Sequence, residues 1–491
     1  MNAVEDSVNN ATARNSLRRR VLLLGAGLWL FYLAFLPPGQ YSVDANSMLA
    51  VSESLVARHT IAVPEGLGIP GRNGQIYSIW YPLLSVLGIP FAYAALFASR
   101  ISGLPFHYVA AVFVSLVPGA LTAATASLIA LISLRLGSSW RGASSAALCF
   151  AFGTVALVYA RTFLADPLLA FVTVFALYLA MGLSPRDLFG AALLSGLAVL
   201  AKPTGVVVGP VLSAYLIAKR VPWRLSVLPA LGTVLGLALY AVYNIVRFVN
   251  PLNFGQPSIF RLSAIPSGIA GQLASPGWGM IWYCPVAVLV IAGARKAWQQ
   301  HRWEVLAIAA IFFSYLLLHS YYEAWYAGWS WGPRYLLPGL AAMCPLLGRL
   351  EGSAKKAAAL LALLGFLINA PTLFTFYERY YSELTEQGIP VYPALAWSFR
   401  LAPFAHEWPA AIRQVQDASK ADVREIFAQR GAPSKTVENS RALRVVAVWW
   451  WVLPLAHIPR AAGAIASVLM LLVGGGLIVT AGRESARACS P

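Results

Sequence analysis

Residues 18–49, RRRVLLLGAGLWLFYLAFLPPGQYSVDANSML, combine the features that decide the fold. Three arginines precede an apolar run from Val21 to Leu36, and a Pro-Pro-Gly sequence then opens a polar stretch that contains Asp44. An apolar run that follows a basic cluster predicts a membrane-spanning helix whose basic end faces the cytoplasm. We therefore expect the N-terminus inside and Asp44 at the opposite face of the membrane.

The same pattern recurs along the chain of 491 residues. Hydrophobic residues make up 59% of the sequence and charged residues 11%, whereas soluble domains carry roughly 25% charged residues. Short basic clusters separate the apolar runs, as the positive-inside bias requires. This topology explains the net charge of +17 better than nucleic-acid binding does, and we expect no nucleic-acid partner.

The succession of apolar runs and basic clusters predicts an all-α multi-pass membrane protein of about twelve spanning helices with both termini cytoplasmic. The later basic clusters fall on the cytoplasmic side only if the apolar segment between Trp80 and Ser99 does not cross the membrane. We therefore expect this segment, which Pro82 and Pro90 interrupt, to lie along the outer interface. The chain then divides into a membrane core, an external polar segment, and a terminal part with interfacial, spanning and cytoplasmic pieces. These parts are residues 1–376 (with a first external loop at 37–105), 377–444 and 445–491.

Ionisable residues that adjoin the predicted spans gather on the outer face. Because charges near hydrocarbon are costly, a cluster of both signs at one rim is a hypothesis for a functional site. Each residue also has a structural explanation, since Asp44 and Asp166 both stand where a helix cap is expected. Asp44 stands out because it heads the largest loop between spans. The group comprises Asp44, Glu53, Arg58, His59, Arg72, Arg161, Asp166, Lys202, Arg247, Glu323 and Arg334.

Several longer segments carry a family resemblance through their order and their predicted side of the membrane. They are YSVDANSMLAVSESL (41–55), GRNGQIYSIWYPLLSVLGIP (71–90), ARTFLADPLLAF (160–171), GLAVLAKPTG (196–205), SPGWGMIWYCPV (275–286) and WYAGWSWGPRYLLPGL (325–340). In this order they resemble the GT-C superfamily of membrane glycosyltransferases. Within it, the chain is similar to the family 39-like, phospholipid-carrier-dependent sugar transferases, which include protein mannosyltransferases and lipid A aminoarabinose transferases.

The resemblance implies a GT-C type helical bundle with interfacial helices in the first external loop. It also implies an inverting enzyme of the plasma (inner) membrane that moves one hexose or pentose from a polyprenyl phosphate to an acceptor hydroxyl or amine outside. Asp44 would be the general base that takes the acceptor's proton. Asp166 would be a second acid that shapes the site or orients the acceptor.

The leaving group of such a reaction is a phosphate, so cations must meet its developing charge. The candidates, in order of preference, are Arg334, Lys202, Arg161 and Arg247. Aromatic side chains offer apolar faces with polar edges to sugar rings and prenyl chains, although aromatic clusters also form interfacial belts. The expected substrate-binding residues are Arg72, Tyr77, Tyr81, Trp329, Trp331 and Tyr335.

The chain departs from its presumed family at two positions. Asp44 is followed by Ala45 and Asn46, where many members of the family have a second acid. The sequence IWYP at 79–82 stands where lipid A aminoarabinose transferases have Glu-Lys before prolines. Both changes remove expected ligands, so we expect no cofactor, with a divalent metal as the alternative. The expected partners are the polyprenyl-phosphate sugar donor, membrane lipids and a glycan, lipid or protein acceptor.

Two other functions fit parts of the pattern. A lipid-linked sugar flippase or transporter would place polar groups near the bilayer midplane in two related halves, whereas these acids lie at the rim and no half-repeat is visible. A surface-polysaccharide polymerase or ligase shares the location and the lipid carrier, but it moves oligosaccharides.

Overall fold

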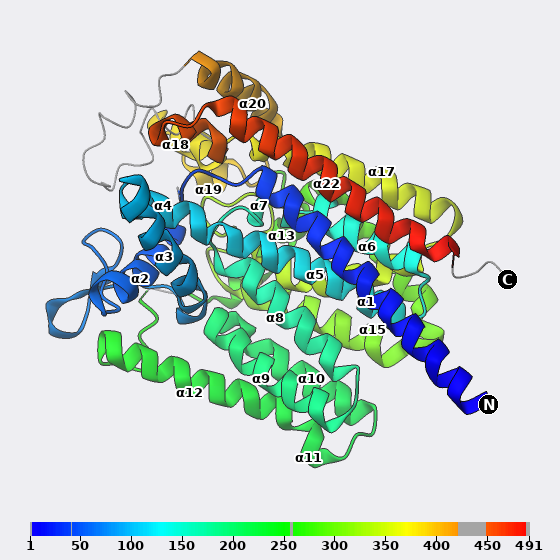
Figure 1. The fold of residues 1–491 in the computed structure, drawn as a ribbon. Coiled ribbons are helices and arrows are strands. Elements are labelled where there is room, and N and C mark those ends of the chain that lie inside the picture. Colours follow the sequence, from blue (N-terminus) through cyan, green and yellow to red (C-terminus); the bar gives the residue numbers. More distant parts are fainter. Residues whose placement is uncertain (1, 41, 256–258, 421–447, 488–491) are drawn as a thin grey trace.

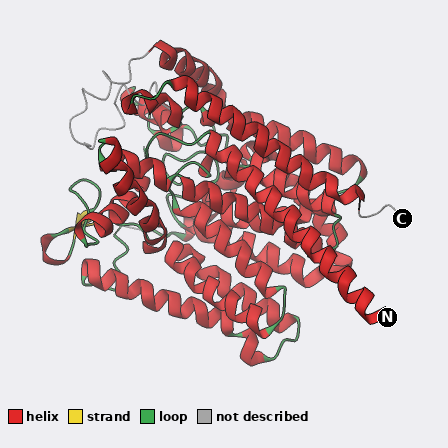
Figure 2. Cartoon of the chain, in the orientation of Figure 1, coloured by secondary structure: helices red, strands yellow, loops and turns green. Residues whose placement is uncertain are grey.

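The structure, a computed structural model, describes residues 2–40, 42–255, 259–420 and 448–487. It is a bundle of helices with one small antiparallel sheet, β1 (Ile69–Pro70) and β2 (Ile76–Tyr77), in the first loop (Figures 1 and 2). In the first third of the chain the helices are α1 (Asn2–Ala34), α2 (Val43–Arg58), α3 (Pro82–Ser102), α4 (Phe106–Val114), α5 (Leu116–Arg135), α6 (Trp140–Gly153) and α7 (Ala156–Tyr159).

The rest of the bundle alternates α-helices with short 3₁₀ turns. The α-helices are α8 (Ala165–Ala180), α9 (Pro185–Ala201), α10 (Val208–Ala218), α11 (Trp223–Ser226), α12 (Leu228–Phe248), α13 (Ile265–Ala274), α14 (Met280–Tyr283), α15 (Val290–Tyr321), α16 (Leu337–Met343), α17 (Gly352–Asn369), α18 (Glu378–Glu386), α19 (Val391–Ala394), α20 (Pro403–Lys420) and α22 (Arg460–Arg487). The 3₁₀ turns are η1 (Arg72–Gly74), η2 (Pro203–Val207), η3 (Leu262–Ala264), η4 (Pro285–Leu289), η5 (Arg334–Leu336), η6 (Cys344–Arg349), η7 (Ala370–Leu373) and η10 (Trp449–Ala456).

Helices α1 and α22 pack side by side and antiparallel. The hydroxyl of Ser467, near the start of α22, donates to the carbonyl of Ala34 at the end of α1 (3.0 Å). Further along, a Cβ on Gly27 would lie 2.6 Å from the carbonyl oxygen of Gly474, so the backbones touch. Small residues allow such close approach between membrane helices. The start of α1 and the end of α22 therefore share one end of the bundle, opposite α2, α3 and α4 (Figure 1).

Helices α9 and α12 are joined by a second glycine contact. A Cβ on Gly232 would lie 1.9 Å from the carbonyl oxygen of Ala192, and a Cβ on Gly236 would lie 2.5 Å from that of Gly196. Glycines four residues apart face the same side of a helix. Outside this contact α12 exposes apolar side chains, including those of Leu231, Val234, Leu235, Leu239 and Val242.

Helix α15 and the turn before it form a hairpin. Tyr283 accepts a hydrogen bond from Asn369 at the end of α17 (2.9 Å), whereas Lys296 pairs with Glu351 just before α17 begins (2.6 Å). The first arm of the hairpin, from Tyr283 to Lys296, thus runs antiparallel to α17 from one end of the bundle to the other. Non-helical dihedral angles at His301 (φ −131°, ψ 40°) then reverse its direction. The second arm returns to the end that carries α2.

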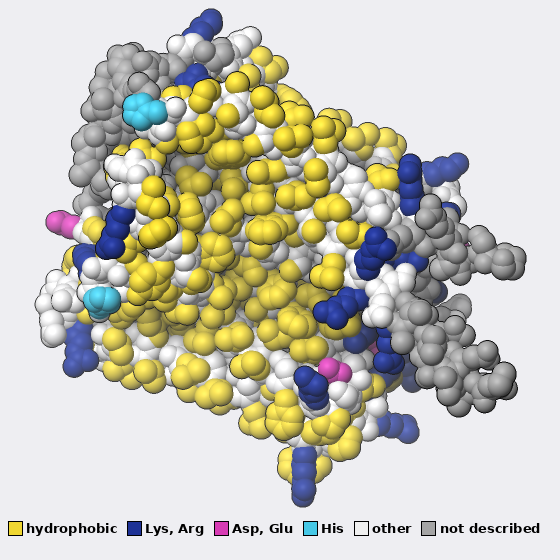
Figure 3. Space-filling view, in the orientation of Figure 1, with side chains coloured by type: hydrophobic (Ala, Val, Ile, Leu, Met, Phe, Trp, Pro, Cys, Tyr) yellow, Lys and Arg dark blue, Asp and Glu magenta, His cyan; other side chains and the backbone are white. Residues whose placement is uncertain are grey.

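The surface and the helix lengths fit a membrane protein. Hydrophobic side chains cover the middle of the face in Figure 3, and Lys and Arg side chains gather towards its ends. Within the described part of the chain, six helical segments are long and apolar enough to cross a bilayer, and two shorter apolar helices accompany them. They include α3, so the interfacial position expected for residues 80–99 stays a prediction, as do the count of about twelve spans and the sides of the membrane.

The expected external segment is helical where it is described. Helices α18, α19 and α20 lie at the same end of the molecule as the first loop (Figure 1). The hydroxyl of Tyr381 in α18 donates to the carbonyl of Ser330 (2.5 Å), which ties this segment to the loop after α15. Residues 421–444 of the expected segment lie outside the described residues. The division of the chain at residues 376 and 444 stays a prediction.

Candidate active site

Asp44 lies in the first turn of α2, where an acidic side chain is favoured by the partial positive charge of a helix N-terminus. The chain enters this helix through a fixed bend, because Asn46 donates to the carbonyl of Gln40 (3.0 Å). The cap position itself is Ser42, so Asp44 is not the N-cap that its sequence position suggested. Its side chain is 25% exposed, which leaves the carboxylate open to a substrate.

Asp166, Lys202 and Arg334 come to the same place from three other elements. Asp166 is in the first turn of α8, and Lys202 directly follows α9, which ends because Pro203 comes next. Arg334 begins η5 after a turn in which Gly332 has a φ of +59°, a conformation that favours glycine. The three side chains are between 3% and 8% exposed.

Arg334 bridges the two carboxylates. Its Nη1 lies 3.4 Å from Oδ2 of Asp44, and its Nε lies 3.7 Å from Oδ2 of Asp166. The Nζ of Lys202 donates to Oδ1 of Asp166 at 2.8 Å. Buried charges are tolerated when they are paired in this way. The two acids and the two preferred cations expected from the sequence thus form one cluster.

The two carboxylates have different environments. Asp166 is held by two cations and is almost completely buried, whereas Asp44 contacts one cation and is partly exposed. Burial among neighbouring protein atoms raises the pKa of Asp44 above its ordinary value, and the guanidinium of Arg334 opposes that rise. A carboxylate that is accessible and more basic than usual suits a general base, while Asp166 holds the cations in place.

A cleft of about 1030 Å³, part of it open to solvent, lies beside the cluster. Tyr335 forms part of its wall, with Nζ of Lys202 4.3 Å and Cζ of Arg334 5.6 Å from the ring centroid. Most of the wall is aromatic or aliphatic. The lining residues are Ile79, Trp80, Tyr81, Lys202, Pro203, Thr204, Val206, Phe254, Phe260, Leu318, His319, Tyr322, Arg334 and Tyr335.

Among the six residues expected to bind substrate, the cleft contains Tyr81 and Tyr335. Trp329 instead stacks on Tyr381, with ring centroids 6.2 Å apart. Trp331 is fully buried, and its indole donates to Asn369 (2.7 Å).

The other two expected substrate residues belong to the first loop. Tyr77 is buried edge-on against Phe248. Arg72 is exposed in the η1 turn. Both lie outside the set of residues that line the cleft.

Arg247 is placed behind the cleft wall. It is completely buried and donates to the backbone carbonyls of Ser78 and Trp80 and to Oδ1 of Asn244. Since residues 79–81 line the cleft, Arg247 positions that wall through the backbone.

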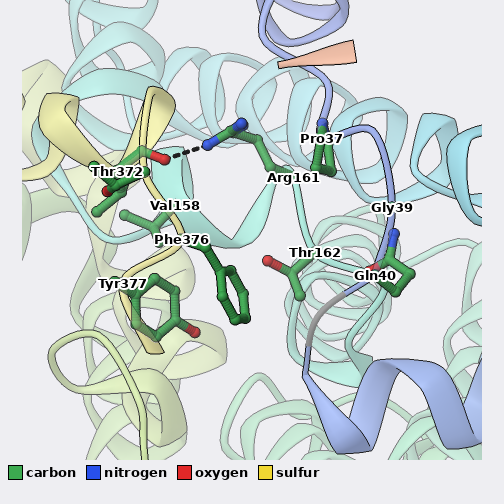
Figure 4. A pocket seen from close by; sticks show the side chains of 10 residues that line it. Pro37, Gly39, Gln40, Val158, Arg161, Thr162, Thr372, Phe376 and Tyr377 are labelled. Atoms are coloured by element: carbon green, nitrogen blue, oxygen red, sulfur yellow. Dashed lines mark hydrogen bonds between the residues drawn. The ribbon is translucent and has the colours of Figure 1, made fainter. Parts of the chain in front are cut away.

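Arg161 lies beside a separate pocket of about 390 Å³. It donates to the carbonyls of Phe35 and Thr372, and Figure 4 shows it among the other residues around this pocket. Those are Pro37, Gly39, Gln40, Val158, Thr162, Thr372, Thr375, Phe376 and Tyr377.

Several cleft residues were missed by sequence reasoning, above all His319 and Thr204. His319 ends the second arm of α15, where a polar side chain closes a long apolar run. That position is a recognisable signal for a functional residue near a membrane. Thr204 lies within the KPTG turn and carries no signal besides its neighbour Lys202. Within the described ranges, no three His, Cys, Asp or Glu side chains gather closely enough to hold a metal ion.

Comparison with solved structures finds similarities at low sequence identity. ArnT from Cupriavidus metallidurans matches in the apo state and bound to undecaprenyl phosphate, with TM-scores of 0.49 and 0.48, 15% identity, and coverage of 93% of this chain and 77% of that one. The oligosaccharyltransferase AglB from Archaeoglobus fulgidus, in complex with an inhibitory peptide and a dolichol-phosphate, matches with a TM-score of 0.46, 12% identity, and coverage of 78% and 60%. Both are GT-C superfamily membrane glycosyltransferases, the group that the sequence segments resemble. No family model and no curated protein matches the chain.

Proposed function

We propose that this protein transfers a single sugar from a polyprenyl phosphate to an acceptor at the outer face of the membrane, with inversion at the anomeric carbon. The observation that carries the proposal is the position of Arg334, which contacts Asp44 on one side and Asp166 on the other at the edge of an aromatic cleft. A base, two cations and an apolar cavity are the parts that such a transfer needs.

The reaction follows from the order of these groups. A hydroxyl of the acceptor attacks the anomeric carbon, and the bond between that carbon and the phosphate oxygen breaks. Asp44 takes the proton of the attacking hydroxyl, and polyprenyl phosphate leaves with the bonding electron pair. A single base and direct displacement give inversion.

The cations stabilise the leaving group. Arg334 and Lys202 both lie at the cleft, so a phosphate there would meet two positive charges as its own charge develops. Asp166 keeps both cations in position through its two oxygens, at 2.8 Å from Lys202 and 3.7 Å from Arg334. Asp166 is therefore a positioning residue in this scheme.

The cleft accounts for the lipid part of the donor. Its wall carries Trp80, Tyr81, Phe254 and Tyr335, and apolar and aromatic surfaces favour burial of a prenyl chain. The cleft and the charged cluster are contiguous because Lys202 and Arg334 belong to both. The lipid and its phosphate can thus bind as one molecule.

The test is Asp44→Asn in reconstituted membranes with a panel of polyprenyl-phosphate sugars and crude envelope acceptors. We expect transfer of one sugar by the wild type and a loss of about 100-fold or more in the variant, with the same melting temperature for both. Equal transfer by the variant would refute the role of Asp44. Movement of lipid-linked sugar across the membrane without any transfer would indicate a flippase, and transfer of an oligosaccharide would indicate a polymerase or ligase.

A further inference from the structure

Two uncharged side chains of the cleft have polar atoms without a hydrogen-bond partner among the described residues. They are His319, through Nε2, and Thr204, through Oγ1. Nε of Arg334 also makes no hydrogen bond within the described chain, but it faces Asp166 at 3.7 Å. A buried polar atom left without a partner is costly, so such atoms in a cleft point to a ligand that satisfies them.

The hydrogen-bonding role of His319 follows from its other nitrogen. Nδ1 lies 2.9 Å from the backbone carbonyl oxygen of Tyr315, which can only accept a hydrogen bond. Nδ1 therefore carries the hydrogen, and Nε2 of the neutral ring is an acceptor.

The surroundings keep the ring neutral. The imidazole stacks on Tyr335, with centroids 4.4 Å apart and planes 18° apart. Lys202 and Arg334 lie 4.3 Å and 5.6 Å from the centroid of that same tyrosine. Asp166 opposes their effect, but it is already paired with both cations. A third positive charge next to these two is disfavoured, so Nε2 offers a lone pair to the cleft.

We propose that His319 and Thr204 recognise hydroxyl groups of an uncharged sugar on the donor. This inference rests on the proposed function and specifies its substrate class. A sugar hydroxyl donates to Nε2 of His319, and the hydroxyl of Thr204 exchanges a hydrogen bond with a second one. Trp80 and Tyr81, which line the same cleft, cover the apolar surfaces of the ring.

The charges of the cleft argue against an amino sugar. Its described lining residues include two cations, Lys202 and Arg334, and no carboxylate. The carboxylates of Asp44 and Asp166 are already engaged by those cations. An ammonium group would add a third positive charge beside Lys202 and Arg334 without a carboxylate in the cleft lining to pair with it, which disfavours its binding.

The experiment measures donor binding to the Asp44→Asn protein in nanodiscs, so that no turnover interferes. The ligands are sugar-free polyprenyl phosphate and polyprenyl phosphates that carry neutral hexoses or pentoses, their single-deoxy analogues, or an amino sugar. His319→Leu and Thr204→Val are introduced into this parent. Leu317→Met, which changes an exposed residue of the same helix outside the cleft lining, is the control.

We expect His319→Leu to weaken binding of the preferred neutral-sugar donor about 10-fold and to leave the Kd of sugar-free polyprenyl phosphate unchanged. One deoxy analogue should bind the parent more weakly than the intact donor does, by the same factor. His319→Leu should bind this analogue and the intact donor equally, because the substitution and the missing hydroxyl remove the same hydrogen bond. Thr204→Val should behave in the same way towards a second hydroxyl position. The control should bind every ligand as the parent does.

Three results would overturn the inference. They are equal weakening of sugar-free polyprenyl phosphate by His319→Leu, insensitivity of the parent to every deoxy position, and tighter binding of the amino-sugar donor than of all neutral ones. Failure of the parent to bind any polyprenyl phosphate, seen before a variant is made, would instead refute the proposed function itself.

Discussion

The guanidinium of Arg334 lies 3.4 Å from the carboxylate of Asp44, although 290 positions of sequence separate them. The contact joins the first loop of the chain to the turn after α15. The same contact holds the partly exposed carboxylate of Asp44 beside the cleft, because Arg334 lines the cleft. The first two predictions depend on how the charges around this contact are shared.

The first prediction concerns the two acids. Asp166→Asn should lower the melting temperature because it leaves Lys202 buried without its partner, a change that costs about 3–5 kcal/mol. Asp44→Asn should leave stability within about 0.5 kcal/mol, because the side chain is partly exposed. Thermal unfolding of both variants in the same detergent separates the two roles. A larger loss of stability in Asp44→Asn than in Asp166→Asn would contradict them.

The second prediction concerns pH. Asp44 acts as a base only when it is ionised, so activity should fall as the pH drops through its raised pKa. Arg334 opposes that rise, and Arg334→Gln should therefore move the acid limb of the pH–rate profile to higher pH, besides slowing the reaction. The profile of kcat/KM between pH 4 and 9 checks this expectation. An acid limb that stays in place or moves to lower pH would rule out coupling between the two residues.

The third prediction concerns Arg247, which contacts backbone carbonyls instead of the charged cluster. Arg247→Met should distort residues 79–81 and thereby raise the KM for the donor. The kcat, measured at saturating donor, should change less than 10-fold. Arg72→Met, an exposed arginine of the same loop, is the matched control and should leave both constants unchanged. A kcat defect as large as that of Arg334→Gln would return Arg247 to the phosphate-binding role expected from the sequence.

The fourth prediction concerns Glu407 in α20, which accepts a hydrogen bond from Thr375. Burial raises the pKa of Glu407 from 4.5 to about 7. The folded state thus favours the protonated carboxyl, and this group's contribution to stability is complete below pH 4.5 and lost as the pH rises through 7. The change amounts to roughly 3 kcal/mol.

Glu407→Gln cannot ionise, so it should remove that part of the pH dependence. Melting temperatures between pH 4.5 and 8 should decline less in this variant than in the wild type. Glu65→Gln, at an exposed position of the first loop, should decline as the wild type does. Parallel curves for the wild type and Glu407→Gln would show that Glu407 does not titrate in this range.

The fifth prediction concerns the contact between α9 and α12. Gly232→Ala places a methyl group 1.9 Å from the carbonyl oxygen of Ala192, and the helices must separate to accept it. We expect a loss of about 1–3 kcal/mol in stability. Gly475→Ala in α22, where a Cβ meets no atom within 4 Å, should be neutral or slightly stabilising. Equal melting temperatures for the two variants would contradict this packing.

The acids and the preferred cations could be foreseen from the sequence, whereas their partners could not. Charge placement beside apolar runs singled out Asp44, Asp166, Lys202 and Arg334, because few ionisable residues adjoin a membrane helix without a reason. The helical membrane character could be foreseen as well, from the recurring apolar runs.

The aromatic and basic residues of the loops were harder to place. Tyr81 and Trp331 have similar surroundings in the sequence, yet one lines the cleft and the other is fully buried. Arg247 satisfies backbone carbonyls that are 167 and 169 residues away along the chain. Such choices depend on tertiary packing, which no local pattern encodes.

The pairing of α1 with α22 has a consequence for biogenesis. The glycine surface of α1 is synthesised more than 400 residues before α22, so it lacks this partner helix for most of translation. A chain that stops before Arg460 leaves this surface uncovered, although every residue of the charged cluster has already been made.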